Sequence, residues 1–261
     1  MNYYNEFDPY AAQWLQNLVD AGLIPRGDID ARSILDVRPS DLAGYTQCHF
    51  FAGIAGWPLA LTLAGWPEDR PVWTGSCPCQ PLSSAGKQKG HADERHIWPA
   101  FYELISECGP ATVFGEQVAS RDGREWFCGV RADLEAVGYA VGGADLCAAG
   151  VCAPHIRQRL FWVADANSPR RQLLAAGPKQ KDGATWGQRR WGYNEPNRIG
   201  KITGLWADAT SIRCTDGKTR RIEPGVSPLA HGVPARVGKL RAYGNAIVAP
   251  LAAEFIKAFM Q

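Results

Sequence analysis

A cysteine in a proline-flanked loop is the clearest candidate for chemistry in this sequence. Residues 75–81 read Gly-Ser-Cys-Pro-Cys-Gln-Pro, and the second cysteine of the loop is Cys79. The loop follows Pro71–Gly75, whose apolar residues predict a short buried strand. Ligands of open α/β sheets bind at the carboxyl ends of strands, so a cysteine held there can face a substrate. A structural turn with two incidental thiols is the alternative at this point.

Four further motifs surround this loop in the sequence. Phe51-Ala-Gly-Ile-Ala-Gly56 is typical of a strand-to-helix turn, where backbone N–H groups and a helix N-terminus can meet a cofactor. Phe114-Gly-Glu-Gln-Val118 stands at a strand end, and Ala153–Phe161 contains an Arg-x-Arg pair. Tyr243-Gly-Asn-Ala-Ile247 opens the last apolar helical segment.

Taken in order, these motifs resemble the DNA cytosine-5 methyltransferase family. The resemblance runs from about Cys48 to Phe259, and its most specific parts are the Pro-Cys-Gln loop and the Gly-Asn-Ala-Ile ending. It implies double-stranded DNA as substrate, S-adenosylmethionine as methyl donor, and a flipped-out cytosine as the reacting base. It also implies a cytoplasmic protein encoded by a bacterium or phage, in the context of restriction and modification.

The resemblance assigns catalytic roles that suit the chemistry of cytosine. Carbon 5 is a poor nucleophile, and addition of the Cys79 thiolate to carbon 6 would make it attack an electrophilic carbon. Glu116 would supply a proton at N3 of the ring. Arg159 would donate to O2 of cytosine, and Arg157 would organise the loop or a phosphate. A structural ion pair between Glu116 and Arg159 is compatible with these roles.

The cofactor positions carried over from the family depart from its usual pattern in one respect. They are Phe51, Gly53, Gly56, Pro78 and Asn245. Family members usually have two further strands between the Gly turn and the Pro-Cys loop, which supply acidic residues for the ribose and the adenine. Residues 56–78 leave room for little more than one helix and one strand. Either the acids in that gap, Glu68 and Asp69, face the ribose, or the pocket for S-adenosylmethionine is incomplete.

Two smaller departures concern single residues. Gln117 stands where the family usually has Asn, and His155 stands where it usually has Gln. Both are polar replacements that can preserve hydrogen bonds.

The apolar pattern predicts the elements that must position these residues. Strands alternate with helices up to Asp165, which predicts an α/β, Rossmann-like fold with a largely parallel sheet flanked by helices. We expect residues 1–46 to be an N-terminal extension with one helix over Tyr10–Gly22. Residues 47–165 and 231–261 should form the catalytic domain, and 166–230 a small irregular domain for target recognition.

Charge is distributed unevenly between these regions. Residues 166–241 hold 15 Lys and Arg against 5 Asp and Glu, whereas the rest of the chain holds 13 against 21. A basic segment on an acidic body favours nucleic-acid binding, with a solvated surface loop as the alternative. The expected DNA contacts are Gln80, Arg170, Arg171, Arg189, Arg190, Arg220 and Arg221.

Several classes of protein are disfavoured by composition. The eight cysteines include no C-x-x-C pair, so we expect neither a zinc site nor a disulfide framework. No apolar run approaches the roughly 20 residues of a membrane span. The alternatives left open are a cytosine-5 enzyme with another one-carbon donor, such as one that adds a hydroxymethyl group, and an inactive DNA-binding homologue. A redox protein using Cys77 and Cys79 would leave the Arg and Asn motifs unexplained.

Overall fold

The computed structural model describes residues 1–78, 97–153, 155–167, 210–213, 219–222 and 244–261. The catalytic candidate Cys79 and most of the basic segment therefore lie outside the described residues. In chain order the elements are β1 (Asn2–Asn5), α1 (Pro9–Asp20), β2 (Gly27–Asp30), η1 (Ile34–Asp36), η2 (Pro39–Leu42), β3 (Gln47–Phe50), α2 (Gly56–Ala64), β4 (Val72–Gly75), α3 (Trp98–Cys108), β5 (Thr112–Val118), α4 (Arg121–Ala136), β6 (Ala140–Cys147), η4 (Ala148–Val151), β7 (Gln158–Asp165), β8 (Thr210–Arg213), β9 (Thr219–Ile222) and α7 (Ala249–Met260).

Seven strands form one sheet in the order β2-β1-β3-β4-β5-β7-β6. Strands β2 to β5 pair in parallel, and β7 runs antiparallel to both of its neighbours. The predicted α/β fold with a largely parallel sheet is confirmed. The helix expected over Tyr10–Gly22 and the last apolar helical segment are present as α1 and α7.

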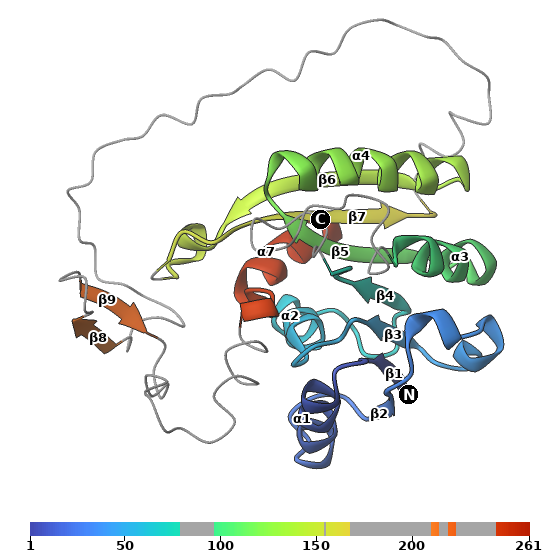
Figure 1. Ribbon diagram of the computed structural model, residues 1–261, viewed down its shortest axis with the longest axis horizontal. Helices are drawn as coiled ribbons and strands as arrows, with labels where there is room; N and C mark the ends of the chain where they lie inside the picture. The colour runs from blue at the N-terminus through green and yellow to red at the C-terminus, as the bar shows by residue number, and fades with distance from the viewer. Residues whose placement is uncertain (79–96, 154, 168–209, 214–218, 223–243) are drawn as a thin grey trace, which may run out of the picture.

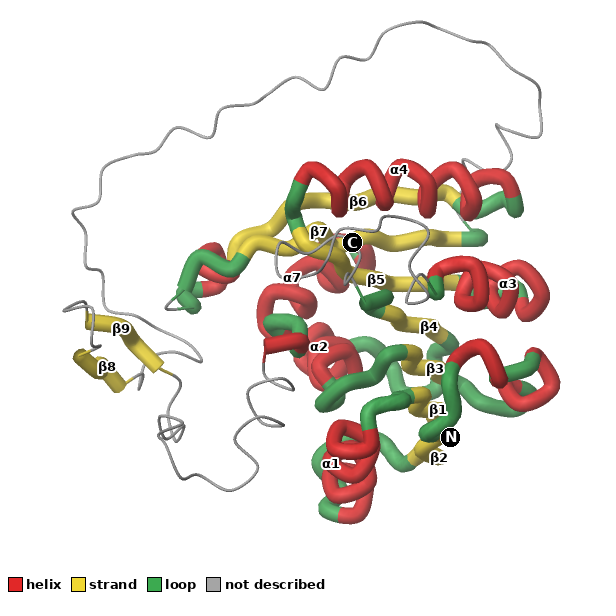
Figure 2. The backbone as a smooth tube through the Cα atoms, viewed as in Figure 1, coloured by secondary structure: helices red, strands yellow, loops and turns green. Residues whose placement is uncertain are grey.

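The N-terminal residues form part of the main sheet, so their interpretation as an extension is wrong. Strand β1 pairs in parallel with β3, and β2 pairs in parallel with β1 on its outer side. The two strands therefore lie on the side of β3 away from β4, as Figure 2 shows. The sheet therefore has two further strands beside β3, although residues 56–78 have no room for them. These strands, β1 and β2, precede the Gly turn in the chain instead of following it.

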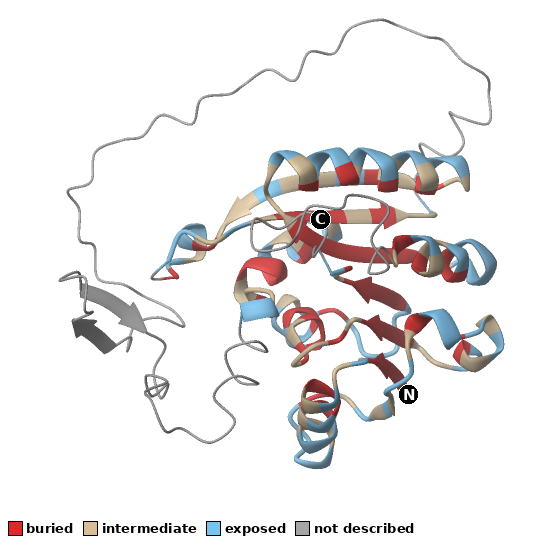
Figure 3. Cartoon of the chain, viewed as in Figure 1, coloured by how far each residue is buried: buried red, intermediate tan, exposed pale blue. Residues whose placement is uncertain are grey.

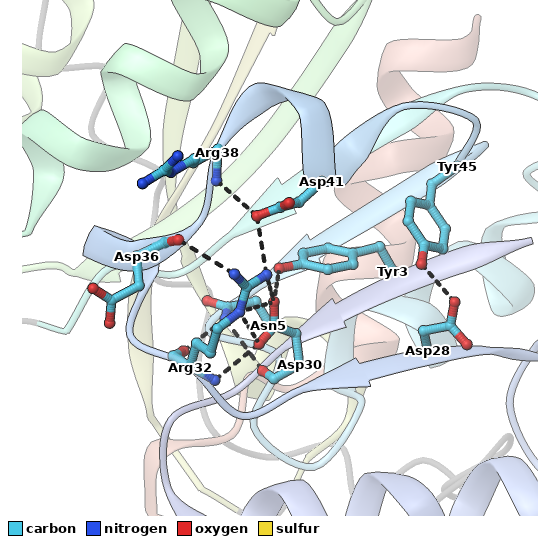
Figure 4. Close-up of polar contacts among 9 residues, drawn as sticks. All are labelled: Tyr3, Asn5, Asp28, Asp30, Arg32, Asp36, Arg38, Asp41 and Tyr45. Atoms are coloured by element: carbon cyan, nitrogen blue, oxygen red, sulfur yellow. Dashed lines mark hydrogen bonds and ion pairs between the residues drawn. The ribbon is translucent and has the colours of Figure 1, made fainter.

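A polar network fixes the connection from β2 to β3 (Figure 4). The Arg32 guanidinium binds Asp30 at 2.7 Å and Asp41 at 3.0 Å, and the hydroxyl of Tyr3 donates to Asp30 at 2.6 Å. Burial raises the pKa of Asp30, but the hydrogen bonds from Arg32 and Tyr3 outweigh it and hold that pKa below its usual value. Asn5 donates to the backbone carbonyls of Asp30 and Arg32. The connecting segment is thereby held against the carboxyl end of β1.

Helices cover both faces of the sheet, and the central strands are buried (Figures 1 and 3). One face packs against α1, α2 and α7 through residues such as Leu15, Trp57 and Ile256. The other packs against η1, η2, α3 and α4, where Phe101 and Trp162 are fully buried. The middle of the sheet is thus shielded on both sides, as a parallel sheet requires.

Local sequence explains where the helices beside the site begin. Asp8 caps α1, because its carboxylate accepts the N–H groups of Tyr10 and Ala11, and Pro9 opens the helix. Helix α2 begins at Gly56 after a turn and ends at Gly65, whose φ of 76° suits glycine. Helix α2 then packs against α7, so the end of the chain lies beside the Gly turn.

Strands β8 and β9 form a two-stranded antiparallel hairpin within the basic segment. This is the part of the expected target-recognition region that the structure describes. Among the described residues, no helix combines the length and the apolar character that crossing a membrane would require.

Candidate functional site

The candidate residues gather at the edge of the sheet where β3, β4 and β5 end. These strands are parallel, so the Gly turn after β3, the Pro-Cys loop after β4 and Glu116 near the end of β5 share that edge. Strand β7 runs the other way and begins there, which brings Arg157 and Arg159 to the same place. The order of strands thus assembles motifs that lie far apart in the sequence.

Glu116 and Arg159 form a buried ion pair. The Arg159 Nε lies 2.6 Å from Oε1 of Glu116, and the Glu116 side chain is 9% exposed. In the antiparallel register Glu116 faces Phe161 and Val118 faces Arg159, so the pair is a diagonal contact on one face of the sheet. Burial raises the pKa of Glu116, while Arg159, Arg157 and Ser76 act in the opposite direction. This carboxyl group holds a proton at higher pH than an exposed glutamate does.

Arg157 joins the Arg-x-Arg loop to the last part of the chain. Its Nη2 donates to the backbone carbonyl of Gly244 at 2.9 Å. Asn245 follows and is exposed, and Ile247 lies against α2: a Cβ placed on Gly56 would come within 2.7 Å of its Cγ1. Gly56 therefore lets the C-terminal motif approach the Gly turn closely.

Of the two cysteines in the Pro-Cys loop, the structure describes Cys77 but not Cys79. The side chain of Cys77 is buried in the core cluster with Trp98 and Phe101. Burial raises the pKa of its thiol far above the ordinary value, so it does not ionise near neutral pH. Pro78 is exposed at the edge of the sheet. Cys79 and Gln80 lie outside the described residues, and the role of Cys79 stays a prediction.

The Gly turn has an unusual backbone. Phe51, Gly53 and Ala55 all have positive φ, at 52°, 58° and 69°. Two of these are not glycine, and such a conformation persists only where the surroundings hold it. The turn runs directly into the N-terminus of α2 at Gly56, so backbone N–H groups gather there.

A residue that sequence reasoning missed holds this turn. Glu6 follows β1, and its Oε2 accepts the N–H of Gly53 at 2.7 Å while its Oε1 accepts the N–H of Asp8 at 2.8 Å. Phe7 beside it is 70% exposed. The sequence does contain a signal for this residue: the aromatic strand β1 is followed by the acid Glu6 and by the capped helix α1. This strand–acid–helix order was expected after the Gly turn, but it precedes the turn.

Glu68 and Asp69 do not lie at the Gly turn, so the expectation that they face the ribose does not fit this geometry. The backbone carbonyls of Pro67, Glu68 and Arg70 accept from Nε2 of Gln47, the first residue of β3. The loop that carries both acids thus precedes β4, at the amino end of the sheet. The Gly turn follows the carboxyl end of β3, at the opposite edge.

Most of the expected DNA contacts lie outside the residues that the structure describes. Arg220 and Arg221 belong to β9. Arg170, Arg171, Arg189 and Arg190 lie outside the described residues. In the described part of the chain, no group of three or more His, Cys, Asp or Glu side chains is arranged to hold a metal ion.

Comparison with known proteins gives a family match. The model of a family described as C-5 cytosine-specific DNA methylase matches residues 65–209, more than half of the chain. The Type II methyltransferase M.AplI of Arthrospira platensis is 35% identical over 95 residues, which are 36% of this chain and 28% of that protein. The chain thus aligns with less than a third of this relative, and β1, β2 and the Gly turn precede the family match.

Two solved structures are also similar. The Dnmt2 methyltransferase of S. pombe matches at a TM-score of 0.40 and 15% identity, over 70% of this chain and 58% of its own. The methyltransferase EhMeth of Entamoeba histolytica matches at a TM-score of 0.41 and 13% identity, over 64% of this chain and 53% of its own.

Proposed function

Because the chain belongs to the C-5 cytosine-specific DNA methylases, we propose that it transfers a methyl group from S-adenosylmethionine to carbon 5 of cytosine in double-stranded DNA. The observation that carries the proposal, beside the family match, is the buried pair of Glu116 and Arg159. It lies at the sheet edge where Pro78 leads into the segment with Cys79.

The residues of the pair suit the two polar edges of cytosine. Addition of the Cys79 thiolate to carbon 6 forms an S–C bond and builds negative charge on the ring, which a proton at N3 relieves. Glu116 can donate that proton because burial raises its pKa. A guanidinium has five N–H donors, so Arg159 can hold Glu116 and still donate to O2 of cytosine.

The Gly turn suits the adenosine part of the donor. Backbone N–H groups at the N-terminus of α2 can bind polar groups, and Glu6 stands beside them, where it accepts the N–H of Gly53. We therefore transfer the ribose contact from Glu68 and Asp69 to Glu6, and assign the exposed Phe7 to the adenine ring. When bound, the donor supplies the electrophilic methyl group.

DNA binding is assigned to the basic segment. A base inside a stacked duplex is unreachable, so the target cytosine must be flipped out. The arginines of residues 166–230 would hold the flanking phosphates, and a few would contact bases. A bacterial or phage origin, with a paired restriction enzyme, is part of this proposal.

Product analysis tests the function. The full chain is incubated with duplex DNA and S-adenosylmethionine carrying a labelled methyl group, and the nucleosides are identified by mass spectrometry. We expect 5-methylcytosine with wild-type protein and with Cys77→Ser, and none with Cys79→Ser. Hydroxymethylcytosine formed from another donor would replace the proposal with the alternative enzyme. DNA binding without any modified base would leave the inactive homologue.

A further inference from the structure

Side chains from three elements form a hydrogen-bonded series behind Glu116. Trp57 is the second residue of α2 and 3% exposed, and its Nε1 donates to Oγ of Ser76 at 3.0 Å. Ser76 directly follows β4 and lies beside Glu116, because Gly75 pairs with Gly115 in the parallel register. A hydrogen bond from Ser76 lowers the pKa of that carboxyl group. Arg159 approaches the same carboxyl group from β7 at 2.6 Å. The series therefore ends on the acid that the proposed reaction uses.

Donor chemistry fixes the direction of these hydrogen bonds. An indole N–H can only donate, so Ser76 accepts from Trp57. The hydrogen bond between Ser76 and Glu116 lowers the pKa of that carboxyl group, as donation of the hydroxyl proton to a carboxylate does. A guanidinium also only donates, so Arg159 cannot take a proton from the acid. Both neighbours thus offer hydrogen to Glu116. The proton of the protonated acid is left to point away from them.

We propose that Trp57 and Ser76 are positioning residues that direct the carboxyl proton of Glu116 toward the target base. This inference rests on the function proposed above. Without the indole N–H, the Ser76 hydroxyl could turn and accept the proton of Glu116, which would then be lost to the base. The N–H of Trp57 occupies one of the two acceptor sites of Ser76 and so favours the rotamer in which Ser76 donates to Glu116.

The indole is held firmly enough for this role. Its ring lies 6.1 Å, centroid to centroid, from Phe114 in a stacked arrangement and 6.1 Å from Phe161 edge-on. Both phenylalanines are fully buried: Phe114 lies in β5 with Glu116, and Phe161 lies in the neighbouring β7. The N–H of Trp57 therefore has a fixed direction, which a surface donor would lack.

Nuclear magnetic resonance can test the series without any turnover. The indole N–H signal of Trp57, assigned by its loss in Trp57→Phe, should shift with pH as Glu116 titrates. The charged groups facing Glu116 among the described residues are Arg159 and Arg157, and neither guanidinium titrates in this range. The shift should persist in Ser76→Thr, which keeps the hydroxyl, and vanish in Ser76→Ala and Glu116→Gln.

Trp66 provides a matched control for this titration. Its Nε1 donates to a backbone carbonyl, that of Arg70, at 3.1 Å, so its signal should not follow Glu116. A Trp57 signal that titrates equally in Ser76→Ala, or one that never titrates in wild-type protein, would overturn the proposal.

Kinetics then separate this inference from the proposed function. Ser76→Ala should lower kcat roughly tenfold with little change in the KM for DNA, because the reacting acid loses the hydrogen bond that directs its proton toward the base. Its alkaline pH limit should move upward, because one interaction that lowers the pKa of Glu116 is gone. Ser76→Thr should restore the wild-type rate and profile.

The outcomes of the two experiments are distinguishable. If wild-type protein methylates DNA and Ser76→Ala keeps its kcat and pH profile, the series has no positioning role and the function stands. If the indole titrates as expected but no cytosine is methylated, the proposed function fails and the hydrogen-bonded series stands.

Discussion

Replacing Glu6 tests whether the N-terminal strands complete the cofactor site. Its carboxylate accepts two backbone N–H groups, from Gly53 at 2.7 Å and Asp8 at 2.8 Å. Glu6→Ala removes both acceptors together with the proposed ribose contact. A hydrogen bond to a charged group is worth about 1.5–3 kcal/mol, so affinity should fall roughly ten- to a hundredfold. Glu6→Gln keeps one carbonyl oxygen and should have a smaller effect.

Titration calorimetry with S-adenosylhomocysteine measures this affinity directly. Glu68→Ala is the matched control, because that acid lies at the opposite edge of the sheet and should bind like wild type. Thermal unfolding of each variant separates loss of the contact from loss of the fold. Unchanged affinity in Glu6→Ala, with weaker binding in Glu68→Ala, would refute the reasoning.

Three further predictions concern the remaining parts of the chain. Deletion of Ala166–Ala230 should eliminate tight duplex binding in a filter-binding assay, and wild-type affinity should fall with salt at a slope of about −0.9 per neutralised phosphate; tight binding by the truncated protein would contradict this. Tyr3→Phe should lower the free energy of urea unfolding by roughly 1–2 kcal/mol at pH 7. The pKa of Asp30 is held below its usual value, so the stability from its hydrogen bond with Tyr3 is present above the pKa of Asp30 in the unfolded chain. That stability is lost as pH falls through the folded-state pKa. An equal loss of stability in Tyr3→Phe at pH 3 and pH 7 would contradict this reasoning. Gly115→Ala should destabilise the fold by about 1–3 kcal/mol because its Cβ would overlap the fully buried indole of Trp162, and an unchanged melting curve would disprove that packing.

The sequence predicted the elements whose apolar pattern was long enough to read. The helix expected over Tyr10–Gly22 and the strand expected over Pro71–Gly75 lie within a few residues of the observed α1 and β4. Apolar residues at helical or strand spacing identify such elements because burial imposes that spacing. The site motifs could be placed at strand ends for the same reason.

The two N-terminal strands could not be predicted in this way. Strand β1 is Asn-Tyr-Tyr-Asn and β2 is Gly-Asp-Ile-Asp, both four residues long and rich in types that strands disfavour. Their stability comes from pairing beside β3 and from the Tyr3–Asp30–Arg32 network, which are contacts between distant segments. Sequence order alone therefore favoured Glu68 and Asp69, which lie at the opposite edge of the sheet from the Gly turn.

The sequence was compatible with an ion pair between Glu116 and Arg159. It did not predict that Ser76 and Trp57 would form a hydrogen-bonded series behind this pair. Ser76 belongs to the Pro-Cys loop and Trp57 directly follows the Gly turn, and neither residue suggested a role. Their contact depends on how α2 packs over the ends of β4 and β5, which only the folded chain determines.

Trapping the covalent intermediate tests the central claim, attack by Cys79 on cytosine, most directly. Duplex DNA with 5-fluorocytosine at the target position is incubated with the full chain and S-adenosylmethionine. In this base, fluorine occupies the position of the carbon 5 hydrogen that is normally lost as a proton after methyl transfer. Fluorine cannot leave as a cation, so the S–C6 bond should persist. Peptide mass spectrometry should find the nucleotide on Cys79, and Cys79→Ser should give no adduct. An adduct on Cys77, or methylated product with Cys79→Ser, would contradict the account.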